Sequence, residues 1–192
     1  MIELPPDQYD VARALFAEYV HGRGSIGSVF EGRQPAKLLV DSTSNPAVAL
    51  LLRPPRHVFL AGDPSCEAVW HYMADLSPRK LFARDQLILS MPNDSWRFPI
   101  KSVLSEGLTE ESRVCFRFTS GEDIAPIQVM TASEHQRKGY ATIVARALIE
   151  EATQREITPS WECDTHNEAS IALAEKLGFE RRSEYSRFWY AP

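Results

Sequence analysis

Apolar residues recur at helical spacing near the start of the chain and in short strand-like runs after it. Residues 5–22 begin with two prolines, carry apolar side chains three and four positions apart, and end at Gly22, which predicts a helix. Apolar runs then indicate strands at 38–41, 48–52, 57–62 and 87–91, with a helix after Pro64 and Ser65. Turn-forming residues fill the stretch between the first two strands, so we expect these strands to form a hairpin.

The second half of the chain alternates between strand-like and helical patterns. The pattern predicts strands at 114–118, 124–131, 160–164 and 185–190, and helices at 140–155 and 167–177. Because a helix joins the second and third of these strands, the two should be parallel neighbours. Helix and strand breakers fill residues 92–112, so we divide the chain into an N-terminal α/β region, residues 1–105, and a C-terminal region, residues 106–192.

Composition narrows the class of protein. The chain has 192 residues, of which 44% are hydrophobic and 24% charged, and a net charge of −5, so it can bury a core and is not suited to bulk nucleic-acid binding. Its three cysteines, Cys66, Cys115 and Cys163, form neither a disulfide framework nor a zinc motif, and we expect no metal. The sequence shows no signal-peptide pattern and no membrane-spanning apolar run, which favours a cytoplasmic protein without a membrane partner.

A candidate anion site lies at residues 131–142, between a strand-like run and a helix. The stretch from Gln136 to Ala141 reads Gln-Arg-Lys-Gly-Tyr-Ala, and Gly139 lets the backbone approach a ligand closely. The first N–H groups of the helix lack earlier carbonyl partners, so they and the positive end of the helix favour a phosphate. The alternative is an ordinary surface turn.

Three further segments, together with this turn, carry a resemblance to a known family. They are Pro159–Asp164, the Asn167–Ser170 helix start, and the Leu173–Phe179 stretch that contains Lys-Leu-Gly-Phe. Over roughly residues 113–190 the chain resembles the GNAT (Gcn5-related N-acetyltransferase) superfamily, and most of all the branch that includes the zwittermicin-A self-resistance acetyltransferase. The resemblance implies an α/β (α+β) GNAT-like fold, with a central mixed twisted sheet flanked by helices. It also implies that the N-terminal part is a diverged half-GNAT.

The same resemblance implies acetyl-CoA as co-substrate. The backbone of residues 129–131 would pair with the pantetheine arm, the N–H groups of residues 137–142 would hold the pyrophosphate, and Lys176 would reach the nucleotide end. Asn167 would hydrogen-bond the arm, and its alternative role is a plain helix N-cap. The implied cofactor-binding residues are Val129, Met130, Thr131, Gln136, Arg137, Lys138, Gly139, Tyr140, Ala141, Thr142, Asn167 and Lys176.

The residues that would catalyse transfer are less evident. The strand before the turn has no carboxylate where relatives carry a general base, and Ala174 stands where many family members have a proton-donating tyrosine, although alanine is usual in the zwittermicin branch. The candidates to replace these groups are Cys163, Ser170, Glu122 and His166. The alternatives are a core cysteine, a solvated acidic turn and a surface histidine.

The sequence therefore favours an acetyl-CoA-dependent N-acetyltransferase that moves an acetyl group directly to a primary amine of a small molecule. The first alternative is a non-catalytic acyl-CoA-binding or degenerate GNAT protein, and the second is an interaction domain that does not bind CoA. A peptide or protein amine is a variant of the acceptor. We expect a monomer or a homodimer.

Overall fold

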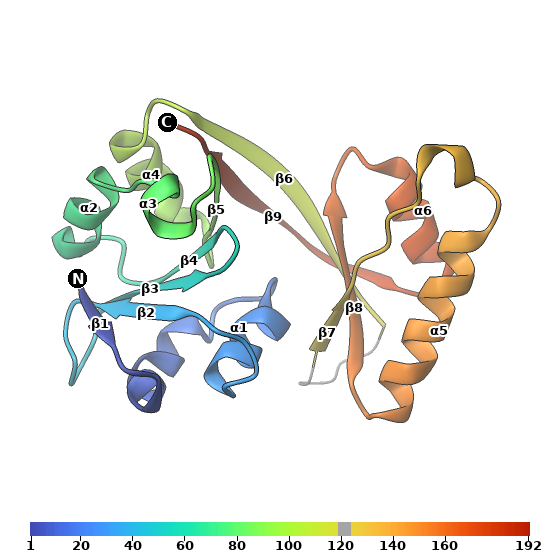
Figure 1. Ribbon diagram of the computed structural model, residues 1–192, viewed down its shortest axis with the longest axis horizontal. Helices are drawn as coiled ribbons and strands as arrows, with labels where there is room; N and C mark the ends of the chain where they lie inside the picture. Colours follow the sequence, from blue (N-terminus) through green and yellow to red (C-terminus); the bar gives the residue numbers. More distant parts are fainter. Residues whose placement is uncertain (119–123) are drawn as a thin grey trace. The chain divides into compact units, whose positions relative to one another are not determined.

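The computed structural model describes residues 1–118 and 124–192, and these form two compact units (Figure 1). The N-terminal unit contains Met1–Glu111 together with Ser186–Pro192, and the C-terminal unit contains Ser112–Tyr185. Strands β6 (Leu108–Arg117) and β9 (Glu180–Tyr190) begin in one unit and end in the other. The division expected between residues 105 and 106 stays a prediction.

The N-terminal unit is built on a mixed sheet in the order β1-β2-β3-β4-β5-β9. Its other strands are β1 (Ile2–Leu4), β2 (Lys37–Val40), β3 (Val48–Arg53), β4 (His57–Gly62) and β5 (Leu87–Ser90). Strands β1 to β4 are antiparallel neighbours, and β5 lies parallel to β4. The expected hairpin is confirmed by the antiparallel register of β2 and β3, in which Leu38 faces Leu51.

Helices cover both faces of this sheet, which explains why its central strands are apolar at successive positions (Figure 1). The 3-10 helix η1 (Pro6–Phe16) and α1 (Arg23–Phe30) pack on the face of Leu51 and Phe59. The other face, with Leu50 and Leu60, packs against residues of α2 (Glu67–Ala74) and α4 (Arg97–Val103), beside α3 (Pro78–Phe82) and η2 (Asp94–Trp96).

One expectation for this unit needs correction, and several of its elements, α1 and α4 among them, were not expected. The first helix is a 3-10 helix that ends at Phe16, before Gly22. Helix α1 was not expected, because Gly22, Gly24 and Gly27 mask its apolar spacing. Helix α4 was not expected either, because it lies in the breaker-rich stretch and carries a proline in its first turn.

The C-terminal unit has the strand order β9-β6-β8-β7, with β7 at Ile124–Ile127 and β8 at Thr158–Asp164. Helix α5 (Tyr140–Gln154) connects β7 to β8, and the two strands are parallel, as expected. Helix α6 (Glu168–Lys176) follows β8 and lies with α5 on one side of the sheet (Figure 1). Phe116, Ile149, Trp161 and Ala174 meet in the core between sheet and helices.

The strand expected at 124–131 is shorter in the structure. Its register with β8 ends at the pair Ile127 and Trp161, and the chain then leads into the short 3-10 helix η3 (Ser133–His135). The side chains of Gln128 and Met130 are exposed, so burial does not hold this stretch against the sheet. In the described part of the chain, no helix is long and apolar enough to cross a membrane, and no His, Cys, Asp and Glu cluster suits a metal ion.

Candidate functional site

Helix α5 begins at an open, positively polarised turn. Gly139 is its N-cap residue, with φ +83°, and no side chain of the described residues caps the helix there. A Cβ atom added at Gly139 would meet no atom of the described residues within 4 Å. Because the first backbone N–H groups of a helix have no acceptor inside it, they are left to face an anion in this space.

Side chains close the loop that precedes this turn. Gln136 donates from Nε2 to the carbonyl oxygen of Thr131 at 3.3 Å, and Lys138 donates from Nζ to that of Glu134 at 2.8 Å. The ammonium group of Lys138 is thus directed back along the loop. The rings of His135 and Tyr140 meet edge to face, with their centroids 6.1 Å apart.

A pocket of about 360 Å³ joins this turn to β8 and α6. Nine of the expected cofactor-binding residues line it: Val129, Thr131, Gln136, Arg137, Gly139, Tyr140, Ala141, Thr142 and Asn167. Trp161, Ser170 and Leu173 line its other side. Of the other three expected residues, Met130 lines the second pocket described below, whereas Lys138 and Lys176 line neither pocket.

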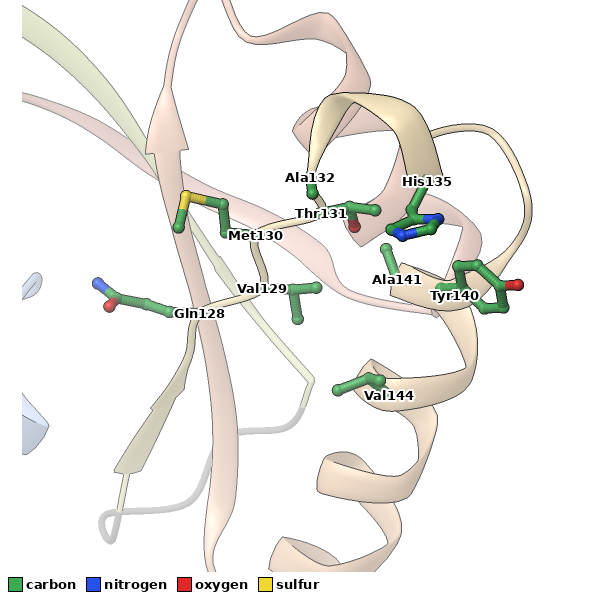
Figure 2. A pocket seen from close by; sticks show the side chains of 9 residues that line it. All are labelled: Gln128, Val129, Met130, Thr131, Ala132, His135, Tyr140, Ala141 and Val144. Atoms are coloured by element: carbon green, nitrogen blue, oxygen red, sulfur yellow. The ribbon is translucent and has the colours of Figure 1, made fainter.

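A second pocket, of about 560 Å³, lies between residues 128–132 and the start of α5 (Figure 2). Figure 2 shows the side chains of Val129 and Thr131 directed toward α5, whereas those of Gln128 and Met130 point away from it. The two pockets share Val129, Thr131, His135, Tyr140 and Ala141. They are therefore neighbouring parts of one hollow beside the turn.

Hydrogen bonds join Trp161, Ser170 and Asn167 on the side of the first pocket that β8 and α6 form. The indole N–H of Trp161 donates to Oγ of Ser170 at 2.9 Å, and the backbone N–H of Ser170 donates to Oδ1 of Asn167 at 3.0 Å. The expectation that Asn167 caps α6 is confirmed. Its contact with a cofactor stays a prediction.

The catalytic candidates differ in their surroundings. Ser170 lines the pocket, whereas Cys163 and His166 are not among its lining residues. Burial raises the pKa of the Cys163 thiol, against an opposing hydrogen bond from Ser170, so the nucleophilic thiolate is disfavoured. The backbone N–H of the exposed His166 donates to Oδ1 of Asp164 at 2.7 Å. Glu122 lies outside the described residues.

Two interactions in this unit were not predicted from the sequence. One is the hydrogen bond from Trp161 to Ser170, which joins residues nine positions apart and has no local signature. The other is the hydrogen bond from the Tyr185 hydroxyl to Oε2 of Glu162, at 2.7 Å. Burial raises the pKa of Tyr185, which keeps this donor protonated. Alternation along β8 places Glu162 on the face opposite Trp161, and this pattern was the available signal.

Comparison with known proteins gives matches in sequence and in fold. Residues 114–188 match the family of GNAT acetyltransferases. An uncharacterized N-acetyltransferase of Bacillus subtilis (strain 168), YdfB, is 37% identical over 75 residues. This match covers 39% of the present chain and 29% of YdfB, so the chain spans less than a third of that relative.

Solved structures resemble almost the whole chain. A GCN5-related N-acetyltransferase-like protein from Streptococcus suis 89/1591 has a TM-score of 0.72 at 18% identity, with 96% of this chain and 98% of that chain covered. A Drosophila melanogaster protein has a TM-score of 0.64 at 10% identity, with 99% and 98% covered. These likenesses confirm the GNAT-like α+β fold, whereas the zwittermicin-A-resistance branch stays a prediction. The chain thus matches GNAT acetyltransferases in sequence over residues 114–188 and has a GNAT-like fold over almost its whole length.

Proposed function

We propose that this protein is an acetyl-CoA-dependent N-acetyltransferase that moves an acetyl group from the thioester directly to a primary amine of a small molecule. The observation that carries the proposal is the pocket that joins the start of α5 to Asn167 and Ser170. At one end lies a helix start without a side-chain cap, which suits an anion, and at the other lie polar side-chain groups. An elongated molecule with a diphosphate and a reactive end fits such a site.

The pyrophosphate of acetyl-CoA would lie on the backbone N–H groups of residues 137–142. The open space above Gly139 supports this placement, because a diphosphate must approach the backbone closely there. The pantetheine arm would pair with the backbone of residues 129–131, like an added strand. Support comes from the end of the β7 register at Ile127, beyond which this backbone has left its ladder with β8.

Two polar residues would complete the grip on the co-substrate. Asn167 uses its Oδ1 atom to cap α6, so its side-chain N–H₂ group is the donor that we assign to the pantetheine arm. Arg137 lines the pocket and would add positive charge beside the phosphates. We place Met130 beside the arm and Lys176 at the nucleotide end, as the family resemblance implies.

Direct transfer, without an acetylated protein, agrees with the chemistry of the site. The thiol of Cys163 is buried, and its raised pKa makes it a poor acyl acceptor. The amine would therefore attack the thioester itself. We expect the acceptor to be a small molecule in the cytoplasm, and the protein to act as a monomer or a homodimer.

An assay of the released CoA thiol tests the function. The protein is incubated with acetyl-CoA and a panel of polyamines, amino acids and amino sugars, and acetylated products are identified by mass spectrometry. We expect amine-dependent thiol release above the rate of hydrolysis, and no acetylated protein when the amine is omitted. Tight binding of acetyl-CoA without transfer to any amine would favour the non-catalytic acyl-CoA-binding protein instead.

A further inference from the structure

The hydroxyl group of Ser170 has a defined orientation inside the proposed acetyl-CoA pocket. The indole N–H of Trp161 is a donor only, so at 2.9 Å the Oγ atom of Ser170 must act as the acceptor. The hydrogen of the Ser170 hydroxyl is therefore directed elsewhere. Trp161 is itself held firmly, because its side chain is 4% exposed and packs against Phe179.

A sulfur atom already lies within reach of this hydroxyl. Burial raises the pKa of the Cys163 thiol, and a hydrogen bond from Ser170 acts against this rise. The Cys163 thiol is a weak hydrogen-bond acceptor, so the hydroxyl is free to turn to a stronger one that enters the pocket. Because Ser170 lines the pocket, its hydroxyl can turn to a sulfur atom that enters there.

The neighbouring turn of α6 offers no alternative donor. Ala174 occupies the position at which the family resemblance implies a tyrosine, and its side chain is fully buried in the core. Ser170 precedes it by four residues, so the two positions lie on the same face of the helix, one turn apart. Ser170 is the one with a hydroxyl, and it lines the pocket.

We propose that Ser170 donates a hydrogen bond to the sulfur of the departing CoA thiolate, and that Trp161 is a positioning residue that orients this donor. The proposal rests on the proposed acetyltransferase function. It assigns the stabilisation of the leaving group to Ser170, which is one of several catalytic candidates in the sequence.

The transfer balances without a proton from Ser170. The neutral amine nitrogen forms a C–N bond with the carbonyl carbon, the C–S bond breaks, and its electron pair stays on sulfur. The proton that the nitrogen loses ends on sulfur by way of solvent, so amine and acetyl-CoA give amide and CoA. A serine hydroxyl is a much weaker acid than a thiol, so Ser170 keeps its proton and stabilises the developing charge, as an oxyanion-hole donor does for oxygen.

The thiol pKa of bound CoA tests this proposal without knowledge of the acceptor. The ultraviolet absorbance of the thiolate is followed against pH for the complex with CoA, and the complex with desulfo-CoA is subtracted to remove the protein's own thiols and phenols. A hydrogen bond to the charged form should lower the pKa of the bound thiol by about one unit relative to free CoA. Calorimetry supplies the affinity for CoA in parallel.

Three variants and one control make the outcome specific. Ser170→Ala should abolish the shift while CoA still binds, Ser170→Thr should retain it, and Trp161→Phe should weaken it because the hydroxyl loses its orientation. Ser102→Ala is the control, since Ser102 is another helical serine, on α4, whose hydroxyl donates to the carbonyl of Phe98. A thiol pKa in Ser170→Ala equal to that in the wild type would overturn the proposal alone. Failure of the wild type to bind CoA would instead overturn the proposed function, and this proposal with it.

Discussion

Replacing Gly139 by alanine separates the stability of the turn at the start of α5 from its proposed affinity for acetyl-CoA. The residue has φ +83°, a left-handed conformation that costs an L-amino acid about 1 kcal/mol. The new Cβ atom would meet no atom of the described residues within 4 Å, so no steric penalty adds to this cost. For a chain of 192 residues, 1 kcal/mol corresponds to a fall in Tm of about 2–4 °C.

The effect on binding should be larger than the effect on stability. The added methyl group would occupy the space assigned to the pyrophosphate, so we expect acetyl-CoA affinity to fall at least about tenfold, equivalent to about 1.4 kcal/mol. Gly32→Ala is the matched control, because Gly32 has φ +70° and equally open surroundings but lies in the N-terminal unit.

Chemical denaturation and titration calorimetry on both variants measure the two quantities. We expect similar losses of stability in the two variants and a loss of affinity in Gly139→Ala alone. Binding of acetyl-CoA by Gly139→Ala as tight as by Gly32→Ala would overturn the placement of the pyrophosphate. A much larger loss of stability in Gly139→Ala would show that the turn is packed in a way that the structure does not contain.

Two further changes test the site and its core. Burial raises the pKa of the Cys115 thiol from 9.0 to about 11, so as the pH rises this thiol ionises in the unfolded chain before it does so in the folded one. The free energy of unfolding should therefore be fully present below pH 9 and fall by about 3 kcal/mol in total as the pH rises to 11. Denaturation at pH 8 and pH 10 should show that the free energy of unfolding falls less between these pH values in Cys115→Ala than in the wild type. Equal falls would contradict the raised pKa of Cys115. Asn167→Ala removes the side-chain cap of α6 and should cost about 1 kcal/mol in urea denaturation, whereas Asn167→Asp should retain most of it. Equal stability of both variants would show that the cap contributes nothing.

The central strands of the N-terminal unit and the starts of α5 and α6 could be predicted from the sequence, because local pattern and tertiary structure agree at these places. The run Val48–Leu52 is apolar at every position, and β3 is buried on both faces of its sheet. Gly139 and Asn167 mark the starts of α5 and α6 by their residue types alone. Both residues belong to the segments that carry the family resemblance, so the same residues indicate the fold and the candidate anion site.

The remaining features depend on contacts that the sequence does not display. The residues Val129, Met130 and Thr131 look like a strand, yet the ladder with β8 has already ended at Ile127. Helix α1 holds its place through Ile26 and Val29, which pack into the core despite the glycines around them. Likewise, the bond that orients Ser170 arises from the packing of α6 on β8, which is a tertiary event. Local propensity could not have supplied any of these.

Hydrogen exchange of the backbone amides at the start of α5 measures whether these groups hold acetyl-CoA. Exchange is measured by NMR or mass spectrometry with and without saturating acetyl-CoA. The first turn of α1, after Gly22, serves as an internal reference, since that helix also begins without a side-chain cap. We expect acetyl-CoA to protect the amides of residues 137–142 and to leave the reference unchanged. Binding of acetyl-CoA without protection of these amides would contradict it.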